Sequence, residues 1–375
     1  MIIKTLIKDA YRHLINIPGW RSNRKIVVIE SDDWGSIRMP SKLVMDKLLN
    51  RGLRVSGEGL RYNLYDTLAN KEDFLSLFHT LSSFRDAAGN FPLFTAISVV
   101  ANPDFEKIRQ SGFSHYYYEP FTKTLDRYYG AETSFPLWEK GIQQRLFVPQ
   151  FHGREHLNVA VWMKALQEGD PQALLAFDQG FWGYNNSHPY RINYQAAFDL
   201  DRKEHLQQQA EIIESGLNLF EQLFGYRATF FVPPNGPFNN TLEVVAAKCS
   251  IQFMSASKIQ KEPMGEGKTR KVYHYIGQKN KYGQFYLTRN CFFEPSQPGR
   301  DWVDSCLNDI RIAFRCRKPA VISSHRVNYI GALDPKNRES GLRQLSALLK
   351  SILQHWPDVE FMTSDELGQL ISNPR

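Results

Sequence analysis

Short apolar runs alternate with longer amphipathic stretches along most of the chain. The apolar runs are typical of buried β-strands, and each ends at a polar or turn-forming residue. We expect strands over 25–31, 93–100, 146–151, 228–232, 252–255, 284–288, 320–323 and in the V-E-F-M stretch near the end. Apolar residues at helical spacing predict helices over 41–51, 71–84, 137–144, 242–248, 303–315 and 339–354, and Thr363 and Glu366 fit the capping box of a last helix.

The alternation of strands and helices indicates a mostly parallel sheet or a barrel. Residues 160–224 are largely helical in pattern, broken by the aromatic loop 181–190, and 261–271 reads as a charged loop containing glycine. We therefore expect an N-terminal helix over 1–24, one α/β unit over 25–375, and a helical and loop insertion at about 157–227. In parallel α/β folds the active site gathers at the carboxyl ends of the strands.

Composition excludes several classes of protein. Hydrophobic residues make up 42% and charged residues 23% of the chain, as in ordinary globular proteins. The net charge of +7 is spread out and shows no nucleic-acid-binding motif. The four cysteines have no C-x-x-C pairing, which suits a reducing compartment. We expect a cytoplasmic protein without a membrane span. Residues 1–17 are basic and amphipathic, which leaves open a peripheral contact with a membrane, although helices of this kind more often pack against their own domain.

The acidic pair Asp32 and Asp33 follows the first predicted strand and precedes the turn Trp34-Gly35. Neighbouring side chains on a strand point apart unless the chain bends, so the two carboxylates can take different roles. On its own such a pair is more often a solvated turn. His152 and His156, four residues apart, would share a face if their segment forms a helical turn.

Two histidines and one carboxylate form a facial set for a divalent metal that leaves positions open for water and substrate. Asp33 is the expected third ligand beside His152 and His156. Asp32 is then the candidate general base, and His325, at the end of the strand 320–323, the general acid that protonates the leaving group. Such a pair of titrating groups suits hydrolysis of an ester or an amide.

The string H-G-R-E-H also matches the H-x-x-E-H motif of inverzincin peptidases, in which the glutamate is the base. That motif belongs inside a long helix. Here a strand and Pro149 precede His152, which disfavours the peptidase.

The chain resembles the NodB-type polysaccharide deacetylases, members of a wider group of deacetylases and glycoside hydrolases. Asp32-Asp33 looks like the family's first motif, His152 to His156 like the second, Pro233 to Gly236 like the third, and Ser324-His325 like the last. The sequences V-I-E-S-D-D-W-G-S and F-H-G-R-E-H-L-N are most similar to those of bacterial polysaccharide (de)acetylase proteins, including the WbmS-like branch. The resemblance implies a distorted (β/α)7 barrel, here with a helical and loop insertion.

The third motif departs from the family pattern. Val232 stands where the family carries an arginine that steadies the base, and Asn235 replaces a tyrosine whose amide helps to hold the oxyanion. Arg289, Arg326 and Arg38 are candidates to replace the arginine. Trp182 and Tyr184 could form a platform for a sugar ring, although core packing explains them equally well. The residues expected to bind substrate are Trp34, Asn102, Asn235, Arg289, Asn290 and Arg326.

The resemblance implies a metal-dependent hydrolase, with zinc as the expected ion, that removes N-linked or O-linked acetyl groups from a sugar or a precursor of a surface polysaccharide. Two alternatives stay open. One is a catalytically silent relative that binds carbohydrate, and the other is a glycoside hydrolase that uses Asp32 as nucleophile or base.

Overall fold

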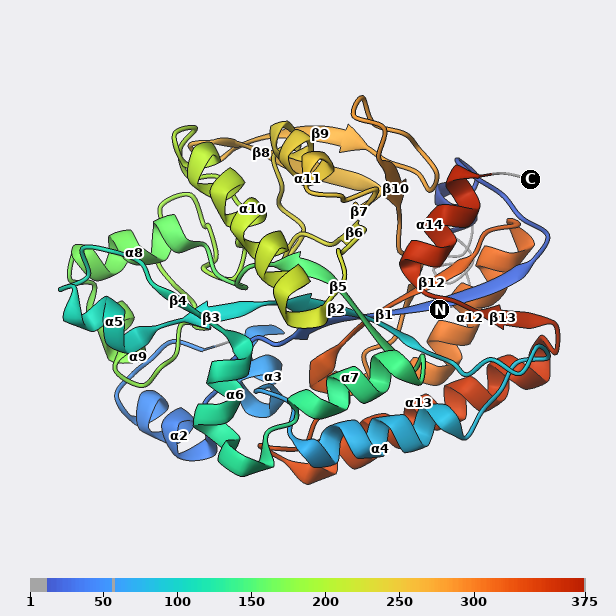
Figure 1. Cartoon of the computed structure of the whole chain (residues 1–375), viewed down its shortest axis with the longest axis horizontal. Coiled ribbons are helices and arrows are strands. Elements are labelled where there is room, and N and C mark those ends of the chain that lie inside the picture. The colour runs from blue at the N-terminus through green and yellow to red at the C-terminus, as the bar shows by residue number, and fades with distance from the viewer. Residues whose placement is uncertain (1–11, 56–57, 374–375) are drawn as a thin grey trace.

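The computed structural model describes residues 12–55 and 58–373, and its centre is a curled parallel sheet (Figure 1). The strands follow the order β10-β7-β6-β5-β2-β1-β12-β11, and each adjacent pair in this order is parallel. Their bounds are β1 Lys25–Trp34, β2 Phe94–Val99, β5 Phe147–Gly153, β6 Phe230–Phe231, β7 Phe253–Ser255, β10 Phe285–Leu287, β11 Cys291–Phe292 and β12 Ala320–His325. The predicted α/β barrel-like fold is confirmed.

The sheet curls back on itself through one short segment. Strand β10 pairs with β7, β11 pairs with β12, and only Thr288, Arg289 and Asn290 separate β10 from β11. Residues 285–292 thus join the two ends of the strand order. The side chain of Asn290 fixes this crossing, because its Oδ1 accepts from the Val321 amide at 2.9 Å and its Nδ2 donates to the Pro319 carbonyl at 2.9 Å.

Strand β1 lies in the middle of the sheet. Its register with β12 places Asp32 opposite His325. On the other edge of β1, strand β2 pairs with residues between Ile29 and Trp34. The short strand β13 (Val359–Phe361) pairs with Lys25–Val27 at the start of β1. Since both faces of β1 are covered, nine of its ten residues are buried. For the same reason the first half of the strand, Ile26–Ile29, is a continuous apolar run rather than an alternating pattern.

Helices surround the sheet, with α4, α7, α12 and α13 on one side and α10 and α11 on another (Figure 1). The predicted helices are confirmed with shifts of a few residues: α2 Lys42–Asn50, α4 Lys71–Ser82, α7 Phe135–Gln143, α11 Glu243–Lys248, α12 Trp302–Arg315, α13 Pro335–His355 and α14 Ser364–Ser372. The Thr363 and Glu366 capping box at the start of α14 is present as expected. The segment 157–227 contains α8 Val159–Gln167, α9 Pro171–Phe177 and α10 His205–Phe224.

Aromatic residues beneath the sheet make up a large part of the core. Trp34 is 1% exposed, and its ring centroid lies 4.7 Å from that of Phe147 and 5.4 Å from that of Phe74. Trp138 of α7 joins this cluster at 5.1 Å from Phe147. Burying side chains of this size contributes about 2–3 kcal/mol each. The end of β1 is therefore anchored by its tryptophan.

Some predicted elements were wrong or incomplete. The segment 261–271 is not a loop: it lies within an antiparallel hairpin of β8 Ile259–Gly265 and β9 Lys268–Tyr273. The prediction also lacked the hairpin of β3 Ala101–Pro103 and β4 Tyr118–Pro120, and the helices α3 Glu58–Tyr65 and α6 Phe121–Tyr129, whereas the helix expected to start at Pro103 and Asp104 is present as α5 Phe105–Gln110. The irregular loop within the 157–227 segment extends from the end of α9 to the start of α10, well beyond 181–190.

Residues 1–11 of the N-terminal helix predicted over 1–24 lie outside the described residues, and the described residues 16–24 are not helical. Of 1–17, only 12–17 are described, and 12–15 are helical. Within the described part of the chain, no helix has both the length and the apolar character needed to cross a membrane.

Candidate metal centre and cavity

The acidic pair lies at the end of β1, where the strand is irregular. The register with β2 shifts between Ser31 and Trp34, and Asp33 has a φ of 77°. A positive φ is unusual for a residue with a side chain. The irregularity sends the two carboxylates in different directions, so that Asp32 meets β12 and Asp33 meets β5. The backbone bend that lets two neighbouring aspartates take different roles is thus present.

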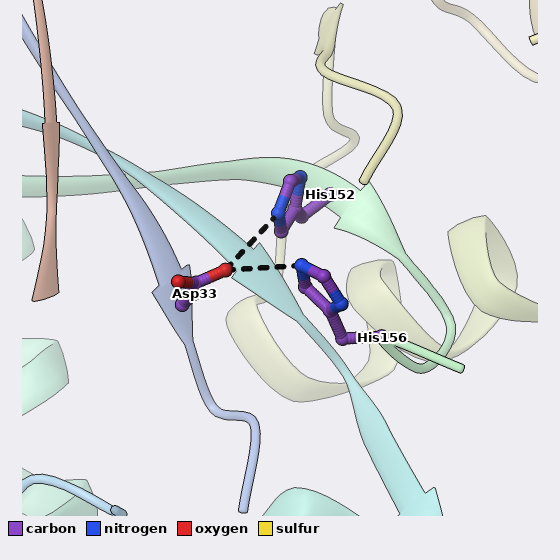
Figure 2. A group of neighbouring side chains, drawn as sticks. All are labelled: Asp33, His152 and His156. Carbon is purple, nitrogen blue, oxygen red and sulfur yellow. Dashed lines mark ion pairs between the residues drawn. The ribbon is translucent and has the colours of Figure 1, made fainter. Parts of the chain in front are cut away.

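Asp33, His152 and His156 converge in one buried group (Figure 2). Asp33 Oδ1 lies 3.5 Å from His152 Nε2 and 3.1 Å from His156 Nε2. One ligand atom from each residue lies within 4.8 Å of the other two. The predicted helical turn is absent from this segment: His152 belongs to β5, Gly153 turns the chain, and His156 lies in the connection to α8. The two imidazoles meet because the chain bends back where β5 ends, so that residues four positions apart face the same point.

The donor set fits a divalent metal. His152 Nδ1 donates to the Val232 carbonyl at 2.6 Å, which leaves Nε2 as the free nitrogen directed at Asp33. Among the residues described, this buried Nε2 has no hydrogen-bond partner. Burial lowers the pKa of His156 to about 4, so that its imidazole is neutral, as a ligand must be. Burial raises the pKa of Asp33, but its contacts with the His152 and His156 rings, together with the charge of Arg38, outweigh this and hold the pKa well below the usual range.

Asp32 is held by Arg289 rather than by a residue of the third motif. Arg289 Nη1 and Nη2 donate to the two carboxylate oxygens of Asp32 at 2.7 and 2.6 Å, while Nε donates to Glu30 at 2.5 Å. Burial raises the pKa of Asp32, yet the guanidinium more than offsets this and the net pKa is lowered. Of the three candidate arginines, Arg289 is the one that contacts Asp32. Val232 contributes through its backbone carbonyl, which orients His152.

His325 faces Asp32 from the neighbouring strand. Its Nε2 lies 3.8 Å from Asp32 Oδ2, and its Nδ1 donates to Glu294 Oε1 at 2.5 Å. Burial lowers the pKa of His325, but the adjacent Glu294 carboxylate dominates and raises the pKa to about 9. Arg61 and Asn328 hold the other Glu294 oxygen, each at 2.9 Å. The imidazole is therefore protonated at neutral pH and can donate a proton from Nε2.

A cavity of about 1130 Å³ connects these groups, a volume slightly above the usual range for a small-molecule site. It is lined by all five residues predicted to be catalytic or metal-binding, which come from distant parts of the chain: Asp32, Asp33, His152, His156 and His325. Arg289, Asn290 and Asn235 of the expected substrate-binding group line it as well. Asn235 is exposed with a φ of 56°, whereas the Asn290 amide is used in closing the sheet.

Three other residues expected to bind substrate lie in the interior, outside the set of described residues that line the cavity. Trp34 packs in the aromatic core and donates from Nε1 to Ser31 at 3.0 Å. Asn102 accepts from the Ile37 amide at 2.9 Å and donates to the Gly35 carbonyl at 3.0 Å, which fixes the turn after the acidic pair. Arg326 is fully buried and binds Asp66 at 2.9 Å. Each stabilises the site's frame from behind.

The aromatic pair of the 181–190 loop divides between core and cavity. Trp182 is 1% exposed, packs against Phe105 and donates to the His156 carbonyl at 3.3 Å. Tyr184 is also buried but lines the cavity. Of the two residues suggested as a sugar platform, only Tyr184 is positioned for contact with a ligand.

The glutamate of H-G-R-E-H is not positioned as a base. Both oxygens of Glu155 are bound by Arg154, at 2.6 and 2.7 Å, and Glu155 is outside the group of described residues that line the cavity. This arrangement opposes the inverzincin interpretation.

Three residues of the site were absent from the predicted set. Glu294 follows the two-residue strand β11, Tyr62 lies on the unpredicted helix α3, and Arg38 was considered only as a partner for the base. Tyr62 and Arg38 line the cavity, and the Tyr62 ring centroid lies 5.7 Å from that of His325. A carboxylate directly after an apolar F-F pair was the one sequence signal available for Glu294.

Comparison with known proteins gives similarities among solved structures alone. No family model matches the chain, and no curated protein matches it. A polysaccharide deacetylase from Mycobacterium smegmatis, described as putative, is 11% identical with a TM-score of 0.45, covering 94% of this chain and 92% of its own. Puue allantoinase is 12% identical with a TM-score of 0.44, covering 93% and 91%. A GH57 branching enzyme from Thermococcus kodakaraensis is 10% identical with a TM-score of 0.46, covering 94% and 72%.

Proposed function

We propose that this protein is a divalent-metal-dependent hydrolase that removes acetyl groups from a sugar or a polysaccharide precursor. The observation that carries the proposal is the Asp33, His152 and His156 group, which shares a cavity with a carboxylate on one side and a protonated histidine on another. The sequence resemblance to polysaccharide deacetylases agrees with this chemistry. We further propose that zinc is the ion and that the protein acts in the cytoplasm.

Asp33, His152 and His156 would hold the metal, as one carboxylate oxygen and two imidazole nitrogens. When bound there, such an ion polarises a carbonyl group and lowers the pKa of a bound water. The remaining steps belong to the chain's own residues.

Asp32 is the general base in this proposal. Although both of its oxygens accept from Arg289, a carboxylate has about four lone-pair sites and can still accept the proton of a water molecule. Arg289 keeps the carboxylate ionised and fixes its orientation. Asp32 thereby resembles a base whose position, rather than a raised pKa, makes it effective.

His325 is the general acid. It carries its proton at neutral pH because Glu294 stabilises the imidazolium, and its Nε2 is directed toward the side of the cavity where Asp32 lies. Proton donation to the departing sugar nitrogen or oxygen converts a poor leaving group into a neutral amine or alcohol. The pairing of a base and an acid on adjacent strands follows from the register that sets Asp32 opposite His325.

The test combines metal analysis with product analysis. Protein purified and reconstituted with zinc is assayed for bound metal and for acetate released from acetylated sugars, as wild type, Asp33→Ala and Asp32→Asn. Asp33→Ala should lose the metal, and Asp32→Asn should keep it and lose about 100-fold or more in rate. Glu262→Gln, a buried carboxylate on β8 that binds Arg270, serves as the control and should keep both properties.

The outcomes separate the alternatives. A protein that binds no metal and releases no acetate contradicts the proposal and favours a carbohydrate-binding relative. New reducing ends without acetate indicate a glycoside hydrolase. Equal loss of metal in Asp32→Asn and Asp33→Ala would show that the division of roles between the two carboxylates is wrong.

A further inference from the structure

Arg38 is a buried cation whose hydrogen-bonding capacity is largely unused. Its side chain is 3% exposed, and its Nε and Nη1 have no hydrogen-bond partner within residues 12–55 and 58–373. Its ion pair with Asp66 is long, at 3.4 Å between Nε and Oδ2. Leaving the donors of a buried charged group unsatisfied is costly, so such donors mark a position where a partner is expected.

The charges around Arg38 do not cancel. Arg326 binds the same Asp66 carboxylate at 2.9 Å from Nε and also donates from Nη1 to the Ser36 carbonyl at 2.8 Å. Two buried guanidinium groups therefore share one carboxylate, and Arg326 has the better geometry. A positive charge remains on the side of Arg38. Arg326 lies behind the cavity wall, whereas Arg38 is part of it.

Arg38 stands close to the metal-binding group and to the general acid. It lines the same cavity as Asp33, His156 and His325. The Tyr62 ring covers one side of the guanidinium, with the Arg38 Cζ 5.0 Å from the ring centroid, and the same ring packs edge-on against His325. Stacking of this kind holds the flat face and leaves the N–H edge available for a ligand.

Asp33 does not satisfy this charge once it serves as a metal ligand. The carboxylate would then be shared with a divalent ion, whose double positive charge would exceed the single negative charge of Asp33, His152 and His156 together. The region around Arg38 then attracts an anion more strongly than before. Arginine suits a carboxylate or phosphate because its planar fork matches two oxygens of such a group.

We propose that Arg38 binds an anionic oxygen group of the ligand, a carboxylate or a phosphate, on the cavity wall beside Asp33, His152 and His156. The inference deepens the proposed function, on which it rests for the placement of a sugar in this cavity. The anion has two sources with the same chemistry: the acetate that hydrolysis releases, or an acidic group carried by the sugar itself.

The experiment measures binding without turnover. Zinc-reconstituted protein is titrated calorimetrically with sodium acetate, inorganic phosphate, N-acetylglucosamine and the carboxylate-bearing N-acetylmuramic acid. The hydrolytically silent Asp32→Asn background is used for the sugars. Arg38→Met removes the charge at similar length, and Arg38→Lys keeps the charge without the fork. Arg300→Met is the matched control, because Arg300 is an exposed arginine that lines the same cavity over the Trp302 ring.

Arg38→Met should weaken anion binding about tenfold or more, Arg38→Lys less, and Arg300→Met no more than about twofold. If the bound anion is acetate, acetate affinity falls and the two sugars are affected alike. If the anion belongs to the sugar, N-acetylmuramic acid loses affinity and N-acetylglucosamine does not. Metal content and the thermal midpoint report on folding, and should Arg38→Met not fold, the comparison of Arg38→Lys with Arg300→Met decides in its place.

Unchanged affinity for all four ligands in folded Arg38→Met overturns the proposal. An equal loss of anion affinity in Arg38→Met and Arg300→Met also overturns it, because it would indicate that the overall positive potential of the cavity attracts the anion. The two proposals fail separately. Arg38-dependent anion binding without any acetate release contradicts the deacetylase function alone, and acetate release with normal anion binding in Arg38→Met contradicts this inference alone.

Discussion

The replacement of Glu294 by glutamine tests whether a neighbouring carboxylate sets the working pH range of the general acid. Glu294 is the main reason that the pKa of His325 is raised from 6.5 to about 9, against the opposing effect of burial. Without that negative charge, only Asp32 and Asp33 still oppose the effect of burial, and the pKa of His325 should fall back toward its ordinary value of about 6.5. Because the proposed acid acts in its protonated form, the basic limb of kcat/KM should move down with it.

The size of the effect follows from the fraction of protonated His325. At pH 8 a group with a pKa of about 9 is about nine-tenths protonated, whereas one with a pKa of about 6.5 is about 3% protonated. Glu294→Gln should therefore lower kcat/KM about 30-fold at pH 8. At pH 5.5 both forms are almost fully protonated, and the two proteins should agree within about twofold.

The assay is acetate release over pH 5 to 10 on zinc-reconstituted protein, with Glu262→Gln as the control. Glu262 is a buried carboxylate bound to Arg270, so its replacement imposes a comparable structural cost away from His325. The control should be less stable but keep the basic limb near 9. A Glu294→Gln profile that falls by the same factor at every pH would refute the reasoning, because it would mean that Glu294 acts through packing rather than through the His325 proton.

Three further predictions concern stability, each measured by urea unfolding. The raised pKa of His325 stabilises the folded state by about 3 kcal/mol below the unfolded-state pKa of about 6.5, and this stabilisation is lost as the pH rises through 9. The difference in the free energy of unfolding between wild type and His325→Asn should therefore shrink over that pH range. A difference that stays constant with pH would contradict the prediction. Arg289→Met leaves two buried carboxylates without their cation and should cost about 3–5 kcal/mol; a cost below about 1 kcal/mol would mean that the pairing is weak. In Gly341→Ala, the new Cβ would lie 1.7 Å from the Asn328 carbonyl oxygen, which should cost about 1–3 kcal/mol through overpacking; no loss would show that the contact relaxes freely.

The sequence pattern was sufficient for the parts of the fold that bury a continuous apolar face. The strands β1, β2, β5 and β12 are buried along nearly all of their length, and each was expected within a few residues. Strand β9 was not, because almost all of its residues are exposed and no alternation of polar and apolar positions marks it. Helix α3 and the short strands β3, β4 and β11 were likewise too short or too polar for a periodic signal.

The convergence of Asp33, His152 and His156 could be predicted because two of them share a local spacing and the third ends a strand. Their geometry could not, since the expected helical turn at His152 is a strand end with a glycine turn. The irregularity between Ser31 and Trp34 also turns the tryptophan into the core, although it directly follows the acidic pair. A local backbone irregularity of this kind leaves no trace in hydrophobic periodicity.

The contact between Arg289 and Asp32 could not be predicted from the order of residues along the chain. Arg289 lies 257 positions from Asp32, and the two meet because residues 285–292 cross from β7 to β12 and so bring the end of β10 next to the end of β1. The same crossing continues into Glu294, which reaches His325 because Phe292 pairs with Ser323 two residues earlier on each strand. One segment that closes the sheet thus provides the partners of both Asp32 and His325. The proposed base therefore does not need an arginine at position 232, because a neighbouring strand end brings the Arg289 guanidinium to the Asp32 carboxylate.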